Sequence, residues 1–219
     1  PVVLVDAPGF GGTPAGEPGL DHVAAQVVDG IRGLGVDRAV VAGLSMGGYL
    51  VMAIAEQAPE LLAGIGLLST KASADPEPAR AKRLEMVTAV ERGEREVAVP
   101  MLEGLLGEAT RNSRLAVEMV DELREQLRNA PLAGLVWAQR SMAERPDRLH
   151  ALQALPDTVP ALVLRGAEDT LMSATDAAAM ARALGVEVTE VAGSGHLAAL
   201  EQPDAVAAAL ADLYARATA

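Results

Sequence analysis

The stretch VVAGLSMGGYLVMAIAEQ, residues 40–57, decides the fold. An apolar run ends at Ala42, and the helical spacing of apolar residues begins almost at once after Ser45. A strand joined to a helix without a loop places the serine on a sharp turn, where its hydroxyl stands clear and the helix N-terminus faces the substrate. Side chains at Gly43 and Gly47 are expected to collide across this turn. The stretch therefore predicts a nucleophile elbow, with Ser45 as nucleophile and the backbone N–H of Met46 as one oxyanion donor.

The rest of the chain alternates short apolar runs with helical patterns. The pattern predicts strands over residues 2–5, 39–42, 65–68, 161–164 and 186–191. It predicts helices over residues 20–34, 47–58, 173–184 and 203–217. Near-continuous apolar strands that alternate with helices are typical of a parallel sheet covered on both faces. We therefore expect an α/β fold with a doubly wound, mostly parallel sheet.

The middle of the chain breaks this alternation, because residues 71–156 contain no strand pattern. Helical patterns there cover residues 78–92, 97–106, 113–128 and 132–144. We predict an all-helical cap, or lid, over residues 71–156, inserted into a core formed by residues 1–70 and 157–219. Such a cap is expected to roof the substrate pocket.

Composition and charge limit the classes of function. The chain has 219 residues, of which half are hydrophobic, and a formal net charge of −12. Because no basic run stands out, nucleic-acid binding and an anionic membrane surface are disfavoured. The absence of cysteine excludes disulfides and thiolate metal sites. Without a signal peptide or a membrane-length apolar run, a cytoplasmic protein is expected, and a homo-oligomer is compatible with the sequence.

A serine nucleophile needs a base, and the chain has three histidines. His22 falls in the first turn of a predicted helix and His150 near the junction of cap and core, so both are expected to be surface or structural residues. His196 follows the strand predicted at 186–191, at the end of the sheet where sites of parallel sheets lie. Asp169, just past another strand, is the expected partner of the imidazole, with Glu168 as the alternate. The order Ser45, Asp169, His196 is the chain order of one known class of serine hydrolase.

These motifs carry a resemblance to the α/β-hydrolase superfamily. The segments DAPGFGG, GLSMGG, GAEDTLMS and GSGHLAALEQP each match the family's pattern and fall in its order, over essentially the whole chain. The cap and the run WAQRSMAERPD are similar to those of cofactor-free esterases and 3-oxoadipate enol-lactonases. The resemblance implies that Ser45 is the nucleophile, that His196 is the general base and then acid, and that Asp169 orients His196. It implies no metal and no organic cofactor.

The chain departs from the family pattern at its amino terminus. In the family, three strands and an oxyanion loop precede the strand that VVLVD resembles. The third of these strands lies in the sheet between the strand that matches VVLVD and the strand that matches AVVAG, before Ser45. Without that strand, residues 2–5 and 39–42 must pair directly or leave edges unsatisfied. A fragment of a longer protein, strands donated by a partner chain and a rearranged short fold would each explain the departure. The loop DAPGFGG is a candidate for the second oxyanion N–H.

The expected substrate is a small-molecule ester or lactone. Phe10, Trp137 and Arg140 are candidate substrate-binding residues, and Trp137 and Arg140, three residues apart, could share one helix face. If Arg140 points into the pocket, the substrate would carry a carboxylate, as an enol-lactone acid does. Carboxylic-ester hydrolysis is the leading prediction. Enol-lactone hydrolysis, carbon–carbon bond hydrolysis, perhydrolysis and a non-catalytic ligand-binding protein are the alternatives.

Overall fold

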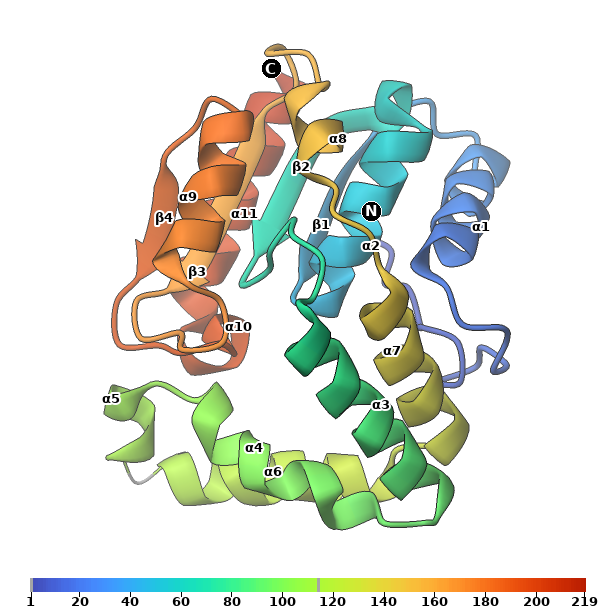
Figure 1. The fold of residues 1–219 in the computed structure, drawn as a ribbon. Coiled ribbons are helices and arrows are strands. Elements are labelled where there is room, and N and C mark those ends of the chain that lie inside the picture. The colour runs from blue at the N-terminus through green and yellow to red at the C-terminus, as the bar shows by residue number, and fades with distance from the viewer. Residues whose placement is uncertain (1, 114) are drawn as a thin grey trace.

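A parallel β-sheet forms the centre of the molecule. The computed structural model describes residues 2–113 and 115–219, and within them the sheet has four strands (Figure 1). They are β1 (Ala39–Leu44), β2 (Leu62–Leu68), β3 (Ala161–Gly166) and β4 (Val188–Val191), and their order in the sheet follows the chain. All neighbours are parallel, as the apolar runs predict. The carboxyl ends of the strands consequently share one edge of the sheet.

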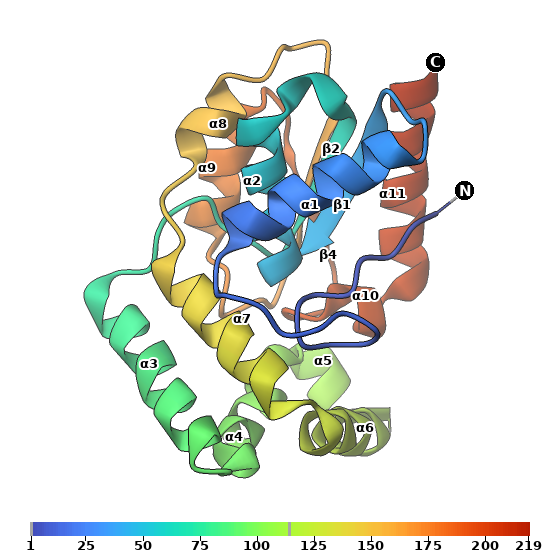
Figure 2. The same ribbon diagram turned by 90° about the vertical axis from the view of Figure 1, so that its right-hand side faces the viewer.

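Helices cover both faces of this sheet (Figure 2). One face carries α1 (Leu20–Gly33), α2 (Met46–Gln57), α8 (Leu149–Gln153) and α9 (Ala174–Ala183). The other carries α10 (Ala198–Glu201) and α11 (Pro203–Thr218). The side chains of β3 alternate between the two cores: Val163 packs with the first group and Leu164 with the second. Burial on both faces explains why the strands read as unbroken apolar runs.

The strand expected at residues 2–5 does not form. Val2, Val3, Leu4 and Val5 expose 89%, 67%, 90% and 53% of their surface. Among the described residues, β1 pairs only with β2, so its outer edge is open. A strand needs a neighbour for its backbone N–H and C=O groups, and apolar side chains alone do not supply one. Of the two outcomes expected for this region, the structure shows the unpaired edge.

The described residues of the inserted segment form helices and connecting turns without a strand, but the helices are more broken than expected. It contains α3 (Glu77–Glu91), η2 (Arg95–Ala98), α4 (Val99–Leu102), η3 (Glu103–Leu105), α5 (Glu108–Arg111), α6 (Leu115–Asn129) and α7 (Leu132–Glu144). One helix was expected over residues 97–106. Pro100 lacks an N–H to continue a preceding turn, and Gly104 is a poor helix former, so only short turns form there. α8 packs on α2 and α9, which places residues 149–153 with the core and not with the cap.

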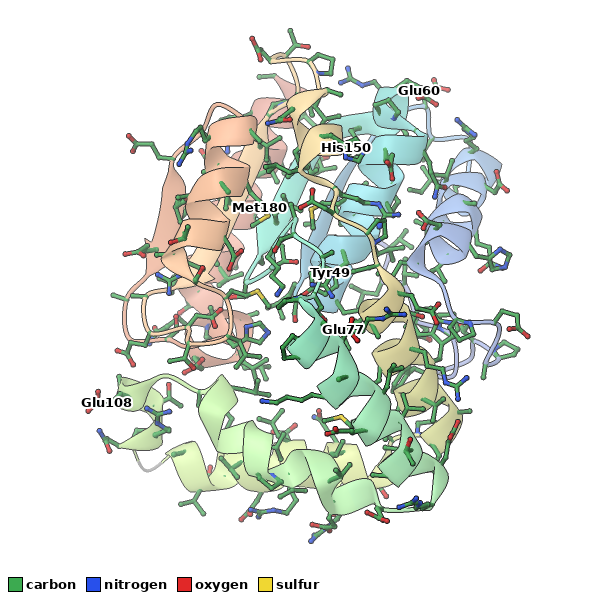
Figure 3. All side chains as sticks on the ribbon, viewed as in Figure 1. Tyr49, Glu60, Glu77, Glu108, His150 and Met180 are labelled. Atoms are coloured by element: carbon green, nitrogen blue, oxygen red, sulfur yellow. The ribbon has the colours of Figure 1, made fainter. Side chains whose placement is uncertain are left out.

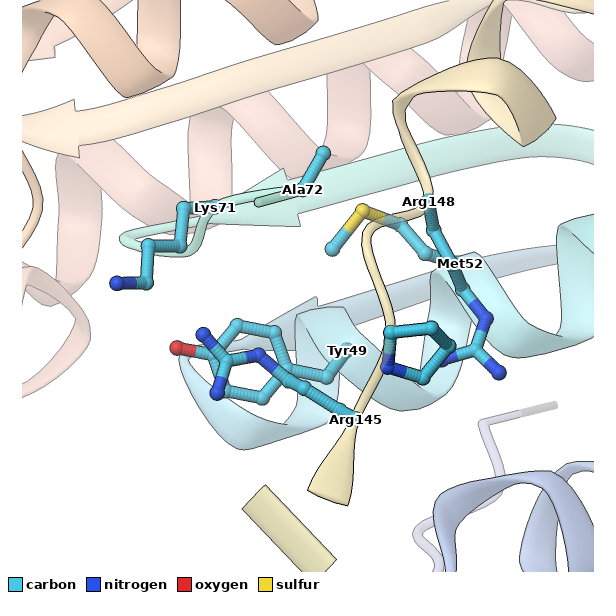
Figure 4. Close-up of a pocket in the computed structure, with 7 residues that line it drawn as sticks. Tyr49, Met52, Lys71, Ala72, Arg145 and Arg148 are labelled. Carbon is cyan, nitrogen blue, oxygen red and sulfur yellow. The ribbon is translucent and has the colours of Figure 1, made fainter. Parts of the chain in front are cut away.

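A buried ion cluster joins the cap to the core where the chain crosses between them. The carboxylate of Asp75 accepts from Arg83 Nε at 2.5 Å and Arg145 Nη2 at 2.9 Å, and Lys71 Nζ lies at 3.1 Å. The side chains of Asp75 and Arg145 are each 1% exposed. The Arg145 guanidinium stacks over the ring of Tyr49, 4.0 Å from its centroid, and Tyr49 belongs to the helix that follows Ser45 (Figure 4). Both chain crossings are therefore fixed to one carboxylate and to α2.

This cluster lowers the pKa of Asp75. Burial alone would raise the pKa of the carboxyl, but the hydrogen bonds from Arg145 and Arg83 and their positive charges outweigh that effect. The pKa therefore lies well below its ordinary value. Desolvation raises the pKa of Tyr49, so its hydroxyl stays protonated beside the cluster.

Candidate active site

Ser45 sits on a strained turn between β1 and α2. Its φ is 51° and its ψ is −113°, a conformation that L residues rarely adopt. The turn is held because Ser45 N–H donates to Leu68 O at 2.8 Å and Thr70 Oγ1 donates to Ser45 O at 2.8 Å. Both partners lie at the carboxyl end of β2. The side chain of Ser45 is thereby presented at the edge of the sheet, as the sequence predicts.

The flanking glycines differ in what the turn requires of them. A Cβ on Gly43 would lie 2.2 Å from the Gly47 carbonyl carbon, so any side chain there is excluded. A Cβ on Gly47 would meet no atom within 4 Å, and the expectation for this position was wrong. The second excluded position is Gly48, where a Cβ would lie 2.5 Å from Thr70 Cγ2. On α2, a side chain at position 47 would point away from neighbouring atoms, whereas a side chain at position 48 would point at Thr70.

His196 reaches both of the side chains with which it was expected to act. Its Nε2 lies 2.9 Å from Ser45 Oγ, and its Nδ1 lies 3.0 Å from Asp169 Oδ2. His196 and Asp169 are 4% and 5% exposed, so solvent competes little for these bonds. An ionised Asp169 accepts a hydrogen bond from Nδ1–H, which leaves Nε2 free to accept the hydroxyl proton of Ser45. The three side chains thus form a continuous relay of hydrogen bonds.

Asp169 is held ionised by its surroundings. Burial would raise its pKa, but the hydrogen bond from His196 and those from the backbone N–H groups of Met172 and Leu171 lower it. Both N–H groups donate to Asp169 Oδ1 at 2.9 Å. The net result is a pKa below the ordinary value, which keeps a full charge next to the imidazole. Glu168, the alternate acid, instead accepts from Ala109 N–H at 3.2 Å.

Arg165 supports the acid from within the sheet and was not anticipated. Its side chain is almost buried on β3, where Nη2 donates to Asp169 O at 2.9 Å and Nη1 donates to Glu190 at 2.7 Å. Its guanidinium fixes the turn that carries the Asp169 carboxylate. A cation inside the apolar run ALVLRG is the sequence signal that marks it.

One oxyanion donor can be assigned beside Ser45. Met46 is the first residue of α2, and the first N–H groups of a helix have no acceptor within it. Its N–H is therefore available next to Ser45. In the loop DAPGFGG, the candidate for the second donor, the N–H groups of Gly9, Phe10 and Gly12 donate within residues 6–13. The second oxyanion donor therefore stays a prediction.

The expected pocket residues Phe10, Trp137 and Arg140 have other partners. Phe10 packs against the core, and a Cβ on Gly134 of α7 would lie 2.8 Å from its ring. Trp137 is 2% exposed and donates from Nε1 to Glu17 O at 3.0 Å. These two aromatic side chains attach α7 to the loop that precedes α1.

Arg140 is not a free charge. Its Nη2 donates to Glu91 at 2.7 Å in an ion pair on the surface of the cap, with 42% of the Arg140 side chain exposed. Trp137 is buried, whereas 42% of the Arg140 side chain is exposed. The helix turns by about 100° per residue, so a spacing of three leaves the two side chains about 60° apart. That difference suffices to put one of them in the core and the other in solvent.

The other two histidines lie away from Ser45. His22 is exposed on α1, within hydrogen-bond distance of Gln26. His150 belongs to α8, which lies toward the end of the sheet away from the cap helices (Figure 3). Its side chain is 64% exposed and its Nε2 is 2.7 Å from Glu56. Both are surface residues, as the sequence predicts.

A family model described as alpha/beta hydrolase family matches residues 1–209. The chain belongs to the alpha/beta hydrolase family. The resemblance drawn from the elbow and loop motifs is thereby confirmed, and so is the fold class. The finer likeness to cap-bearing esterases and enol-lactonases stays a prediction, as does the shortened amino terminus.

Several relatives resemble this alpha/beta hydrolase over most of its length. The structure of a thermophilic esterase from Thermogutta terrifontis, solved with malate bound, is 30% identical and has a TM-score of 0.87, covering 95% of this chain and 77% of that one. The enol-lactonase from Burkholderia xenovorans LB400 is 20% identical with a TM-score of 0.82, covering 96% and 79% respectively. The biotin biosynthesis bifunctional protein BioHC of Cellvibrio japonicus (strain Ueda107) is 29% identical over 222 residues, and this chain spans 42% of its length.

Two further features of the described residues bear on the site. None of the helices in residues 2–113 and 115–219 is long and apolar enough to cross a membrane. In the same part of the chain, no three His, Asp or Glu side chains gather in a way that could hold a metal ion.

Proposed function

We propose that this protein is a serine hydrolase that cleaves a carboxylic ester through an acyl-enzyme. The observation that carries the proposal is the placement of His196 Nε2 2.9 Å from Ser45 Oγ while Nδ1 faces Asp169. A hydroxyl is a poor nucleophile at neutral pH and becomes reactive when a base in hydrogen-bond reach can take its proton. The strained backbone of Ser45 is consistent with the same role.

The reaction follows from these positions. Ser45 Oγ attacks the ester carbonyl carbon as its proton passes to His196 Nε2, and Asp169 stabilises the imidazolium that forms. The carbonyl oxygen takes up the negative charge next to the Met46 N–H at the positive end of α2. Collapse of this intermediate breaks the ester C–O bond, and the alcohol leaves with the proton from His196. Water then attacks the acyl group with His196 again as base, which releases the acid and restores Ser45.

The relatives favour an ester as substrate. The Thermogutta terrifontis esterase shares 30% of its sequence with this chain and has the same fold over 95% of it. The enol-lactonase, at 20% identity, supports the fold alone. With Arg140 engaged by Glu91, no contact among the described residues singles out a substrate that carries a carboxylate.

The test is covalent labelling of the 219-residue chain with a fluorophosphonate, followed by intact-mass measurement. We expect one adduct on the wild-type protein and none on Ser45→Ala or, at the same exposure, on His196→Ala. Turnover of p-nitrophenyl esters of increasing acyl length, with simple lactones in parallel, then assigns the substrate class. A folded wild-type protein that takes no adduct would overturn the proposal, and hydrolysis of lactones without esters would overturn its ester part.

A further inference from the structure

A short segment of the cap lies directly on the loop that carries His196. We call residues 105–109 the clasp segment. Its Leu105 O accepts hydrogen bonds from His196 N–H at 2.8 Å and Leu197 N–H at 3.3 Å. The backbone of the proposed base therefore donates to a cap residue and not to the core.

Glu201 closes this contact from the other side. Its Oε1 accepts from Gly195 N–H at 2.8 Å, and its Oε2 accepts from Gly107 N–H at 2.7 Å. Gly195 immediately precedes His196, and Gly107 belongs to the clasp segment. One carboxylate thus links the two backbones, and Glu201 itself is the last residue of α10 in the core.

The two backbones meet without room for side chains. A Cβ on Gly107 would lie 2.7 Å from Gly195 N, and a Cβ on Gly195 would lie 2.5 Å from Gly107 N. Next to them, Leu106 is 1% exposed and seals the contact. Such a fit allows few alternative positions for the loop, because packed backbone cannot give way as a flexible side chain can.

We propose that Glu201 is a positioning residue for His196, and that His196 is held within reach of Ser45 only while the clasp segment is docked. This inference rests on the proposed function. Hydrogen bonds from backbone N–H groups to a carboxylate are stronger than neutral ones, so Glu201 supplies much of the hold on both backbones. The cap then affects the rate of the chemical step by fixing the position of His196, in addition to any role in covering the substrate pocket. Loss of the contact with the clasp segment lets His196 Nε2 move away from Ser45 Oγ while the nucleophile elbow stays intact.

The test compares Glu201→Gln with Glu168→Gln in the full chain. An amide keeps the shape of Glu201 but turns an N–H₂ group toward one of the two backbone N–H groups, which repel it. Glu168 is the matched control, because it also accepts from the clasp segment, at Ala109 N–H, but its side chain makes no hydrogen bond to the backbone of Gly195 or His196. We expect Glu201→Gln to lower the rate of fluorophosphonate labelling and kcat for a small p-nitrophenyl ester by about ten- to a hundred-fold.

In Glu201→Gln, KM for the small ester is expected to stay unchanged. The labelling rate and kcat of Glu168→Gln are expected to match those of wild type within about twofold.

A second readout needs no turnover. The far-downfield proton resonance of His196 Nδ1–H reports the hydrogen bond to Asp169, and we expect it to broaden or vanish in Glu201→Gln but persist in Glu168→Gln. A purely structural role would lower thermal stability without this change at a temperature where the protein is folded.

The outcomes separate the inference from the proposed function. No labelling of wild type would count against the hydrolase, while the Nδ1–H resonance would still decide the role of Glu201. If the wild type is labelled and Glu201→Gln keeps both its labelling rate and its Nδ1–H resonance, the inference is overturned. An equal fall in labelling rate and kcat in Glu168→Gln would also overturn it. So would a Glu201→Gln variant in which only KM changes. If Glu201→Gln does not fold, Gly107→Ala supplies the test, because its Cβ pushes the clasp segment off Gly195 while the carboxylate remains.

Discussion

The substitution Asp75→Asn tests the ion cluster that joins the cap to the core. The carboxylate faces Arg145, Arg83 and Lys71, and its side chain is 1% exposed. Removing its charge leaves the Arg145 guanidinium, itself 1% exposed, without its counter-charge. Breaking a buried ion pair in this way costs about 3–5 kcal/mol of stability. We expect the free energy of unfolding of Asp75→Asn to fall by that amount at pH 7.

The assay is urea unfolding followed by circular dichroism. The matched control is Glu60→Gln, which removes one carboxylate from the exposed pair with Arg32, where the two side chains are 65% and 53% exposed. A surface pair contributes about 0–1 kcal/mol, so the control should change little. If Asp75→Asn loses no more stability than Glu60→Gln, the reasoning about this cluster is refuted.

The pH dependence gives the same prediction an independent check. The folded pKa of Asp75 lies below its unfolded value of roughly 3.9, so ionised Asp75 stabilises the fold above that pH. This contribution is lost as the pH falls below roughly 4 toward the folded pKa. The gap in stability between wild type and Asp75→Asn should therefore be constant near neutrality and narrow in acid. A gap that widened in acid would contradict the assigned sign.

Three further outcomes are expected. Gly43→Ala should abolish fluorophosphonate labelling or folding, because its Cβ would lie 2.2 Å from the Gly47 carbonyl carbon. Gly47→Ala should be labelled normally and should raise the melting temperature, because alanine has the higher helix propensity. Equal labelling and stability of the two variants would contradict the assigned geometry. Asp169→Asn should lower the labelling rate by on the order of 10⁴-fold with the fold retained, since the amide favours the wrong tautomer of the imidazole. Arg140→Ala should leave ester kinetics unchanged and cost less than about 1 kcal/mol, because it loses only a surface pair with Glu91; a raised KM would instead place Arg140 at the substrate.

The proposed site was readable from the sequence where local rules determine geometry. A strand–serine–helix junction has one sharp form, so Ser45 followed from its neighbours alone. The ends of parallel strands share an edge, so Asp169 and His196 could be placed together although the chain separates them. The alternative Glu168 was excluded only by side-chain direction, which the structure supplies.

What the sequence did not predict has a different cause, because each case depends on contacts made far along the chain. Residues 2–5 have the apolar character of a strand, but no composition supplies the neighbour that a strand requires. The partners of Trp137 and Arg140 were also unforeseen: Trp137 donates to Glu17 O and Arg140 donates to Glu91. Glu201 was missed because its partners are backbone N–H groups, which leave no mark in the side-chain pattern.

The burial of Trp137 has a practical consequence. It is the only tryptophan among 219 residues, it is 2% exposed, and its indole N–H is bonded to the loop before α1. Its emission therefore reports one event, the separation of α7 from that loop, without a background from other indoles. A shift of this emission to longer wavelength, or quenching by acrylamide, would measure how often the cap lifts from the core in the unlabelled protein. The molecule thus contains a natural optical probe of its own opening.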